Sequence, residues 1–184
     1  MDGNERFRGL LEPVYPLALG FARHLSRSRS EGDDLFQEAV IRALTRIETL
    51  RDEAAFKPWL YRIVISVHRN RCRRAFWRRF LPLPDQVAAD EPSVSGANFR
   101  ASDWSPGAAE SARRAREALA SLPADQREAI VLFEMEDWRV EEIAEVHGVS
   151  ASAIKSRLAR GRVRMRAYYD KRFGTAPALT EELP

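Results

Sequence analysis

The side chains with the clearest chemistry lie in the segment EEIAEVHGVSASAIKSRLARGRVRMR, residues 141–166, where a glycine turn precedes a strongly basic run. Residues 155–172 contain eight Lys or Arg and a single acid, Asp170. Guanidinium and ammonium groups pair with phosphates and donate hydrogen bonds to base edges. These residues therefore predict recognition of a polyanion and not catalysis.

A helix-turn-helix would organise this chemistry. Ala144 and Gly148 stand four residues apart, as this motif requires of a small helical residue and a turn glycine. Ser150 can cap the second helix, which would enter a major groove N-terminus first. The inward seam of that helix consists of Ile154, Leu158, Gly161 and Met165. The residues expected to face DNA are Ser150, Ser152, Lys155, Ser156, Arg157, Arg160 and Arg164.

We expect Lys155 and Arg160 to reach base edges. We expect phosphate contacts from Arg157, Arg162 and Arg164. A basic helix face is more often simply solvated. The glycine turn, the apolar seam and the scarcity of acids together favour DNA binding over that alternative.

A second basic surface lies in residues 57–80, which contain eight Lys or Arg and no acid. Here aromatic residues are mixed with basic ones, a combination that suits stacking on unpaired bases. Phe56, Trp59 and Tyr61 also fit the apolar stripe of a helix, so the core is their first expected location. The residues expected to be exposed are Arg62, His68, Asn70, Arg73 and Arg74. Two basic surfaces on one chain predict a polyanion contacted at two places.

The elements that position these surfaces are all predicted to be helices. Apolar residues recur at helical spacing from Phe7 to Leu25, and Pro13 and Pro16 predict a kink or two short helices. We read SRSRSEGDD as a turn whose acids, Glu31 to Asp34, cap a helix over about 33–47. A long helix should follow from Lys57-Pro58 to about residue 79.

The second half of the chain begins with a change of composition. Residues 81–107 are rich in proline and acids, which predicts a flexible linker. Helices are expected at about 108–120, 123–136 and 139–147, followed by the helix from Ser150, and residues 173–184 read as a disordered tail. The fold class is therefore all-α, with two small helical domains at 1–80 and 108–172.

Composition and motifs exclude several classes. No phosphate-binding glycine loop, dinucleotide fingerprint or zinc-protease motif occurs, so we expect no enzyme, and the scattered Cys72, His24, His68 and His147 predict no metal or other cofactor. No apolar run is long enough for membrane insertion, and no signal peptide is recognisable. A lone cysteine suits a reducing cytoplasm.

Four sequence motifs, taken in their order along the chain, resemble those of a known protein family. The segments DDLFQEAVIRAL, AFKPWLYRIV with its basic continuation, SLPADQREAIVLF, and residues 141–166 together resemble the extracytoplasmic-function (ECF) sigma factors of the bacterial sigma-70 family. The likeness covers roughly residues 5–80 and 108–170. It implies a promoter-specificity subunit that binds core RNA polymerase and promoter DNA, and in such families an inhibitory anti-sigma factor is common.

The resemblance also implies roles for particular residues. The first domain would be region 2, docking on polymerase through Asp34, Leu35, Gln37 and Glu38. The second would be region 4, whose helix from Ser150 reads the −35 element. Contacts to the −10 element would come from Phe56, Lys57, Trp59, Arg62, His68, Asn70, Arg73 and Arg74.

Two alternatives remain open at this point. A stand-alone helix-turn-helix regulator explains residues 141–166 and leaves DDLFQEA and the aromatic-basic helix unexplained. A nonspecific nucleic-acid binder would have no need of an organised Ala/Gly turn.

Overall fold

The computed structural model describes residues 3–80 and 106–174, and within these ranges the chain forms helices and no strand. The all-α prediction is therefore confirmed. The chain divides into two compact units, the first ending at Phe99 and the second beginning at Arg100. Each unit has its own buried core.

The first unit begins with two short helices, α1 (Gly3–Leu11) and α2 (Tyr15–Leu25). The break between them contains Pro13, and Pro16 occupies the first turn of α2, where its missing N–H leaves no bond unmade. The sequence predicted either a kink or two short helices at these prolines, and the structure confirms two short helices. Helix α2 buries Ala18, Phe21, Ala22 and Leu25.

Helix α3 spans Arg29–Leu44, so the prediction of a turn up to Asp33 is wrong. Ser28 is the N-cap: its Oγ accepts a hydrogen bond from the Glu31 backbone N–H at 3.1 Å. The segment SRSRSEGDD therefore starts the helix instead of preceding it. At its C-terminal end α3 stops at Leu44, about one turn before the predicted end near residue 47. The short 3₁₀ turns η1 (Ile47–Thr49) and η2 (Glu53–Ala55) then lead to the next helix.

Gly32 lies where α3 packs tightly against α2. A Cβ at this position would lie 2.5 Å from the Cα of Arg23, a distance that no real contact tolerates. Arg23 in turn donates from Nε to the Asp33 carboxylate at 2.6 Å. The absence of a side chain at residue 32 thus sets the separation of the two helices.

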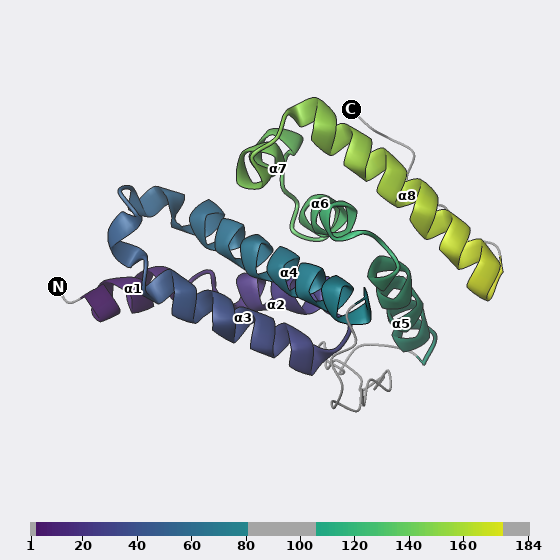
Figure 1. Cartoon of the computed structure of the whole chain (residues 1–184), viewed down its shortest axis with the longest axis horizontal. Coiled ribbons are helices and arrows are strands. Elements are labelled where there is room, and N and C mark those ends of the chain that lie inside the picture. Colours follow the sequence, from purple (N-terminus) through teal and green to yellow (C-terminus); the bar gives the residue numbers. More distant parts are fainter. Residues whose placement is uncertain (1–2, 81–105, 175–184) are drawn as a thin grey trace. The chain divides into compact units, whose positions relative to one another are not determined.

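Helix α4 (Phe56–Phe80) completes the first unit and lies beside α3 (Figure 1). Its buried residues pack on α2 and α3, with the Tyr61 ring stacked on Phe21 at a centroid distance of 4.8 Å. Arg71 joins the two long helices: its Nε donates to Glu38 Oε2 at 2.9 Å and its Nη2 donates to the Asp34 carbonyl at 2.9 Å.

The second unit consists of α5 (Pro106–Ala120), α6 (Ala124–Glu134), α7 (Val140–His147) and α8 (Ala151–Phe173). Its core gathers apolar side chains from all four helices and the α5–α6 turn, among them Ala118, Leu122, Val131, Leu132, Ile143, Ile154 and Leu158. The four predicted helices of this half are present. The predicted linker lies outside the described residues except for its last two, which already belong to α5, and so does the predicted tail beyond Gly174.

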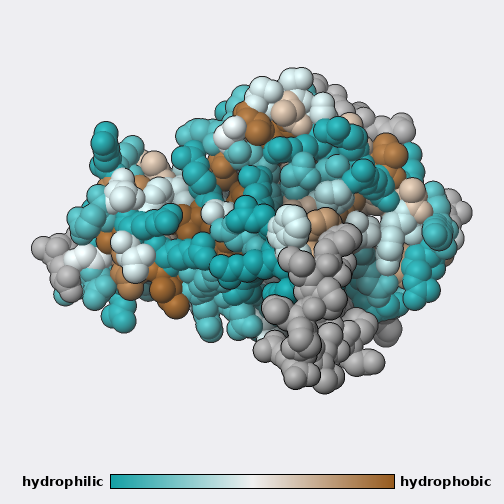
Figure 2. Space-filling view, viewed as in Figure 1, coloured by the Kyte–Doolittle hydropathy of each residue, from teal (hydrophilic) through white to brown (hydrophobic). Residues whose placement is uncertain are grey.

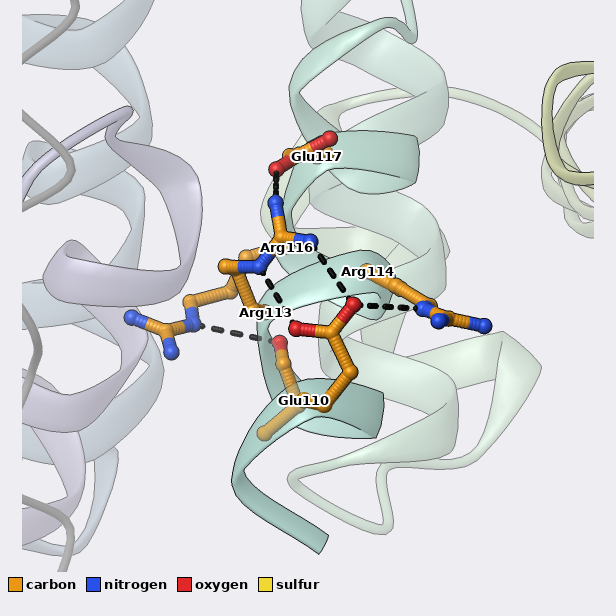
Figure 3. Close-up of polar contacts among 6 residues, drawn as sticks. Glu110, Arg113, Arg114, Arg116 and Glu117 are labelled. Carbon is orange, nitrogen blue, oxygen red and sulfur yellow. Dashed lines mark hydrogen bonds and ion pairs between the residues drawn. The ribbon is translucent and has the colours of Figure 1, made fainter. Parts of the chain in front are cut away.

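An ion-pair cluster stiffens α5 (Figure 3). Glu110 accepts hydrogen bonds from Arg113 Nη2 at 2.7 Å and Arg114 Nε at 2.8 Å, and Arg113 also pairs with Glu117. The bonds from Arg113 and then Arg114 lower the pKa of Glu110 from 4.5 to about 2. The Arg114 guanidinium also lies 5.1 Å from the ring centroid of Phe173, which connects the cluster to the end of α8.

Acid should weaken this cluster in a defined window. Because the folded-state pKa of Glu110 is depressed, its stabilising contribution is complete above its ordinary pKa of 4.5 and is lost as the pH falls through about 2. Glu110→Gln should remove this part of the pH dependence. Thermal melts of wild type and variant between pH 5 and 2 measure it, and equal slopes for the two proteins would contradict it.

In the described parts of the chain, no helix is long and apolar enough to cross a membrane.

Candidate nucleic-acid interface

The turn before α8 has the geometry of a helix-turn-helix. Gly148 ends α7 with a φ of 66°, a left-handed conformation that suits glycine. The Val149 N–H then returns to the Ala144 carbonyl at 3.0 Å. Ser150 caps α8, its Oγ accepting from the Ala153 N–H at 3.2 Å. The predicted turn glycine and N-cap are both confirmed.

The inward seam of α8 is also confirmed. Ile154, Leu158 and Gly161 are buried and Met165 is half-buried. At Gly161 a Cβ would lie 3.0 Å from Ile130 Cγ1, so the absent side chain lets α8 pack closely on α6. This contact fixes which side of α8 faces away from the core.

The sides of α8 that are turned away from the core carry exposed polar and basic residues along its first four turns. The Arg160 Nε donates to the Ser156 carbonyl at 3.2 Å, which holds the guanidinium along the helix surface. Arg164 is exposed as well, with its Nη1 3.3 Å from Gln126 Oε1. The predicted DNA-facing residues found exposed are Ser150, Ser152, Lys155, Ser156, Arg160 and Arg164.

Arg157 and Arg162, in contrast, hold the unit together. Arg157 Nη1 lies 3.0 Å from His147 Nδ1 and its Nε lies 3.2 Å from Asp125 Oδ2, so one guanidinium joins α8 to α7 and α6. Arg162 donates twice to Glu134 Oε1, at 2.9 and 2.6 Å, beside the Phe133 ring. Their side chains are 18% and 17% exposed, which leaves little of either for phosphate contact.

Arg157 should therefore act by positioning α8. Arg157→Lys is expected to lower the melting temperature of the second unit and its affinity for duplex DNA together, because one ammonium cannot reproduce two directed contacts about 3 Å long. We expect a stability loss of about 1 kcal/mol. Differential scanning fluorimetry and duplex titration measure the two effects. Arg160→Lys, at an exposed position of the same helix, is the matched control for stability. Unchanged stability in Arg157→Lys would contradict the prediction.

In the first unit, α4 presents a partly exposed basic face. Arg62, Arg73 and Arg74 are exposed, Asn70 is half-buried and accepts from Arg73 Nη2 at 2.9 Å, and Lys57 and Trp59 are half-buried near the start of the helix. Lys57 Nζ lies 5.7 Å from the Tyr61 ring centroid. These residues lie on one helix but extend over several turns, so they form a strip.

Two residues predicted for this strip lie in the core instead. His68 is 4% exposed because it continues the seam of Leu60 and Val64 at spacings of four, a period that the sequence already contained. Its Nε2 lies 3.5 Å from Cys72 Sγ. Phe56 is 3% exposed and packs edge-on against Phe7, which agrees with the core interpretation of the aromatic residues. It can support Trp59, at 5.8 Å between rings, but has no surface for a base.

The predicted docking face on α3 is partly present. Asp34 and Gln37 are exposed, whereas Leu35 is 1% exposed and belongs to the core, so its assignment to a surface is wrong. Glu38 is half-buried and paired with Arg42 at 2.6 Å and with Arg71. Ile41, 64% exposed, continues the face one turn on. Its helical offset of four from Gln37 would have identified it in the sequence.

Exposed apolar side chains elsewhere occur singly or in small groups among hydrophilic ones (Figure 2). On α4, Phe76 and Trp77 are each 55% exposed. Sequence periodicity did not single them out, because aromatic residues on a helix are ordinarily assigned to its core.

Together, the all-helical units and the basic helix-turn-helix define a two-part DNA-binding protein. Comparison with known families matches residues 10–78 to sigma-70 region 2 and residues 112–165 to sigma-70 region 4. The ECF RNA polymerase sigma-E factor of Haemophilus influenzae is 32% identical over 139 residues, covering 73% of this chain and 72% of that protein.

Two further comparisons agree. A Xanthomonas campestris protein named probable RNA polymerase sigma factor RfaY is 34% identical over 168 residues, covering 88% of this chain; the chain spans 39% of that relative's length. The solved structure of the sigma factor RpoE in complex with the anti-sigma factor NepR from Bartonella quintana is similar with a TM-score of 0.64 and 26% identity, covering 90% of this chain and 98% of that one.

The chain belongs to the ECF sigma factors of the sigma-70 family. Sigma-70 regions 2 and 4 place it among the DNA-binding transcription initiation factors. A stand-alone helix-turn-helix regulator is not favoured, because the first unit matches region 2 as well.

Proposed function

We propose that this sigma factor binds bacterial core RNA polymerase and directs it to promoters, with α8 reading the −35 element and α4 the −10 element. The exposed face of α8 carries the argument. Short side chains at Ser152 and Ser156 let the helix approach a major groove, and Lys155 and Arg160 extend from the same face toward base edges.

For the −10 element the supporting observations are the half-buried Trp59 and the exposed Arg62 three residues further along α4. An indole held by the core on one side and open on the other can stack on an unpaired base, an interaction of roughly 1–3 kcal/mol. That energy offsets the few kcal/mol that separating and unstacking a base requires. The exposed Arg62 would then bind a phosphate of the same strand.

For polymerase docking we propose the face formed by Asp34, Gln37 and Ile41 on α3, with Glu38 at its edge. It combines polar groups at its rim with one exposed apolar side chain, as protein interfaces commonly do. We also propose that the protein acts in the cytoplasm, where promoter DNA lies, and that an anti-sigma factor can bind it, since the similar RpoE was solved in complex with one.

Gel filtration with bacterial core RNA polymerase tests the proposal. The full chain should co-elute with the core enzyme in a stoichiometric complex. Asp34→Arg, which reverses a charge on the docking face, should weaken co-elution at least tenfold, by adding a like or unpaired charge to the interface. Glu12→Arg makes the same charge change at an exposed position outside that face and is the matched control.

If the wild-type chain fails to co-elute yet binds duplex DNA selectively, the polymerase assignment is wrong. If both charge variants behave alike, the docking face is wrong and the sigma-factor assignment is untouched.

A further inference from the structure

The last described turns of α4 extend beyond the packed core of the first unit. Every residue from Arg73 to Arg78 is exposed, whereas most residues between Phe56 and His68 are buried or half-buried. Phe76 and Trp77 lie in this exposed part, 55% exposed each, with their rings edge-to-face at a centroid distance of 5.8 Å. We call Arg73, Arg74, Phe76, Trp77 and Arg78 the terminal aromatic surface.

Exposure of two large aromatic rings to water at the end of a helix is unfavourable, so binding of a partner that covers them is favoured. The charge of the surface selects that partner. Three of its five residues are arginines, and residues 57–80 contain no acid that could neutralise them internally along the helix. The complementary partner is therefore a polyanion with apolar or aromatic faces, a description that fits nucleic acid.

The length of α4 decides which part of the nucleic acid is within reach. Trp77 follows Trp59 by eighteen residues on one continuous helix, which corresponds to about 27 Å of rise. At 3.4 Å per base pair this is roughly eight base pairs of duplex. If Trp59 holds an unpaired base, the terminal aromatic surface therefore lies well away from that base.

We propose that the terminal aromatic surface binds the promoter duplex between the −10 and −35 elements. This inference rests on the proposed function, because it takes the Trp59 end of α4 to lie at the −10 element and the chain after Phe80 to lead toward the unit that reads the −35 element. The arginines bind backbone phosphates, and the Phe76 and Trp77 rings lie against sugars or a base step of the minor groove, where apolar side chains are accommodated.

Site-specific photocrosslinking in the full chain tests the proposal. A benzophenone amino acid replaces Trp59 in one protein and Trp77 in another, and each is assembled with bacterial core RNA polymerase. The probe is a promoter fragment recovered from a random-sequence library with the wild-type holoenzyme. We expect the residue-77 probe to crosslink to duplex DNA upstream of the residue-59 crosslinks, by about eight base pairs.

The results separate the two proposals. Crosslinks from residue 59 to the opened strand, with crosslinks from residue 77 only to protein or to unpaired bases, overturn this inference and leave the proposed function intact. No crosslink to DNA from residue 59 overturns the assignment of α4 to the −10 element.

An affinity measurement supplies a second readout. Phe76→Ala combined with Trp77→Ala should weaken holoenzyme binding to the same fragment by about tenfold, the size of one lost aromatic contact. Leu17→Ala, which removes a side chain that is 51% exposed on α2, is the matched control and should leave affinity unchanged. Because both aromatic residues are outside the core, circular dichroism should show full folding. Equal affinities for the double variant and the control would contradict the proposal.

Discussion

Replacing Gly32 with alanine should destabilise the first unit by about 3 kcal/mol, the upper part of the range for overpacking a close contact. The added methyl group would lie 2.5 Å from the Cα of Arg23, 2.8 Å from its Cγ and 3.0 Å from its backbone nitrogen. Two of these atoms belong to the backbone of α2, so no side-chain rotation relieves the clash. Helices α2 and α3 must instead move apart, which opens the core between them.

Gly20→Ala provides the matched control, since Gly20 is also a helical glycine of the first unit and a Cβ there meets nothing within 4 Å. That change should stabilise the protein by roughly 0.5–1 kcal/mol through helix propensity. Hydrogen exchange followed on peptides from α2 and α3 resolves the first unit from the second. Increased protection from hydrogen exchange in both variants would show that the stability of the first unit does not depend on the close approach of α2 and α3.

Replacing Arg160 with alanine should reduce discrimination between the preferred −35 sequence and its single-base variants by about tenfold, as expected for the loss of one base-edge contact. The residue is exposed on the face of α8 that carries Ser152 and Ser156, and its guanidinium donates to the Ser156 carbonyl of the same helix. Its removal costs the folded protein little. Titration of labelled duplexes with the full chain gives the discrimination directly.

Arg162→Ala is the matched comparison because it deletes the same group two residues away. Its guanidinium is committed to Glu134 and Phe133, so we expect unchanged discrimination and a stability loss of about 1 kcal/mol or less. A uniform loss of affinity on every sequence for Arg160→Ala would show that it binds phosphate. Lost discrimination for Arg162→Ala would show that its ion pair opens on DNA.

Local signals in the sequence predicted most of the helices. The prolines at 13 and 16 predicted the break between α1 and α2, Lys57-Pro58 predicted the start of α4 within a residue or two, and Ser150 with Gly148 predicted the turn before α8. Each of these depends on backbone chemistry within a few residues. The sequence also predicted which face of α8 is exposed, because the N-cap and the apolar seam together determine the rotation of the helix about its axis.

The failures depend on contacts between residues distant in the chain. Arg157 was expected on DNA, but its partners are His147 and Asp125, ten and thirty-two residues earlier, and only the packing of three helices brings them together. Leu35 was assigned to a surface by family resemblance, which gives a motif its role without separating its buried positions from its exposed ones. The start of α3 was misplaced because a run of Ser, Arg and Gly also suits a turn.

The Arg71 contacts have a kinetic consequence. One guanidinium on α4 binds both a side chain and a backbone carbonyl of α3, so the proposed docking face and the proposed strand-binding helix are already fixed relative to each other in the free protein. Neither surface has to be ordered on encounter, and the conformational entropy cost of association is correspondingly small. The first unit should therefore bind polymerase at a rate limited by diffusion and orientation, with affinity differences between its variants appearing mainly in dissociation.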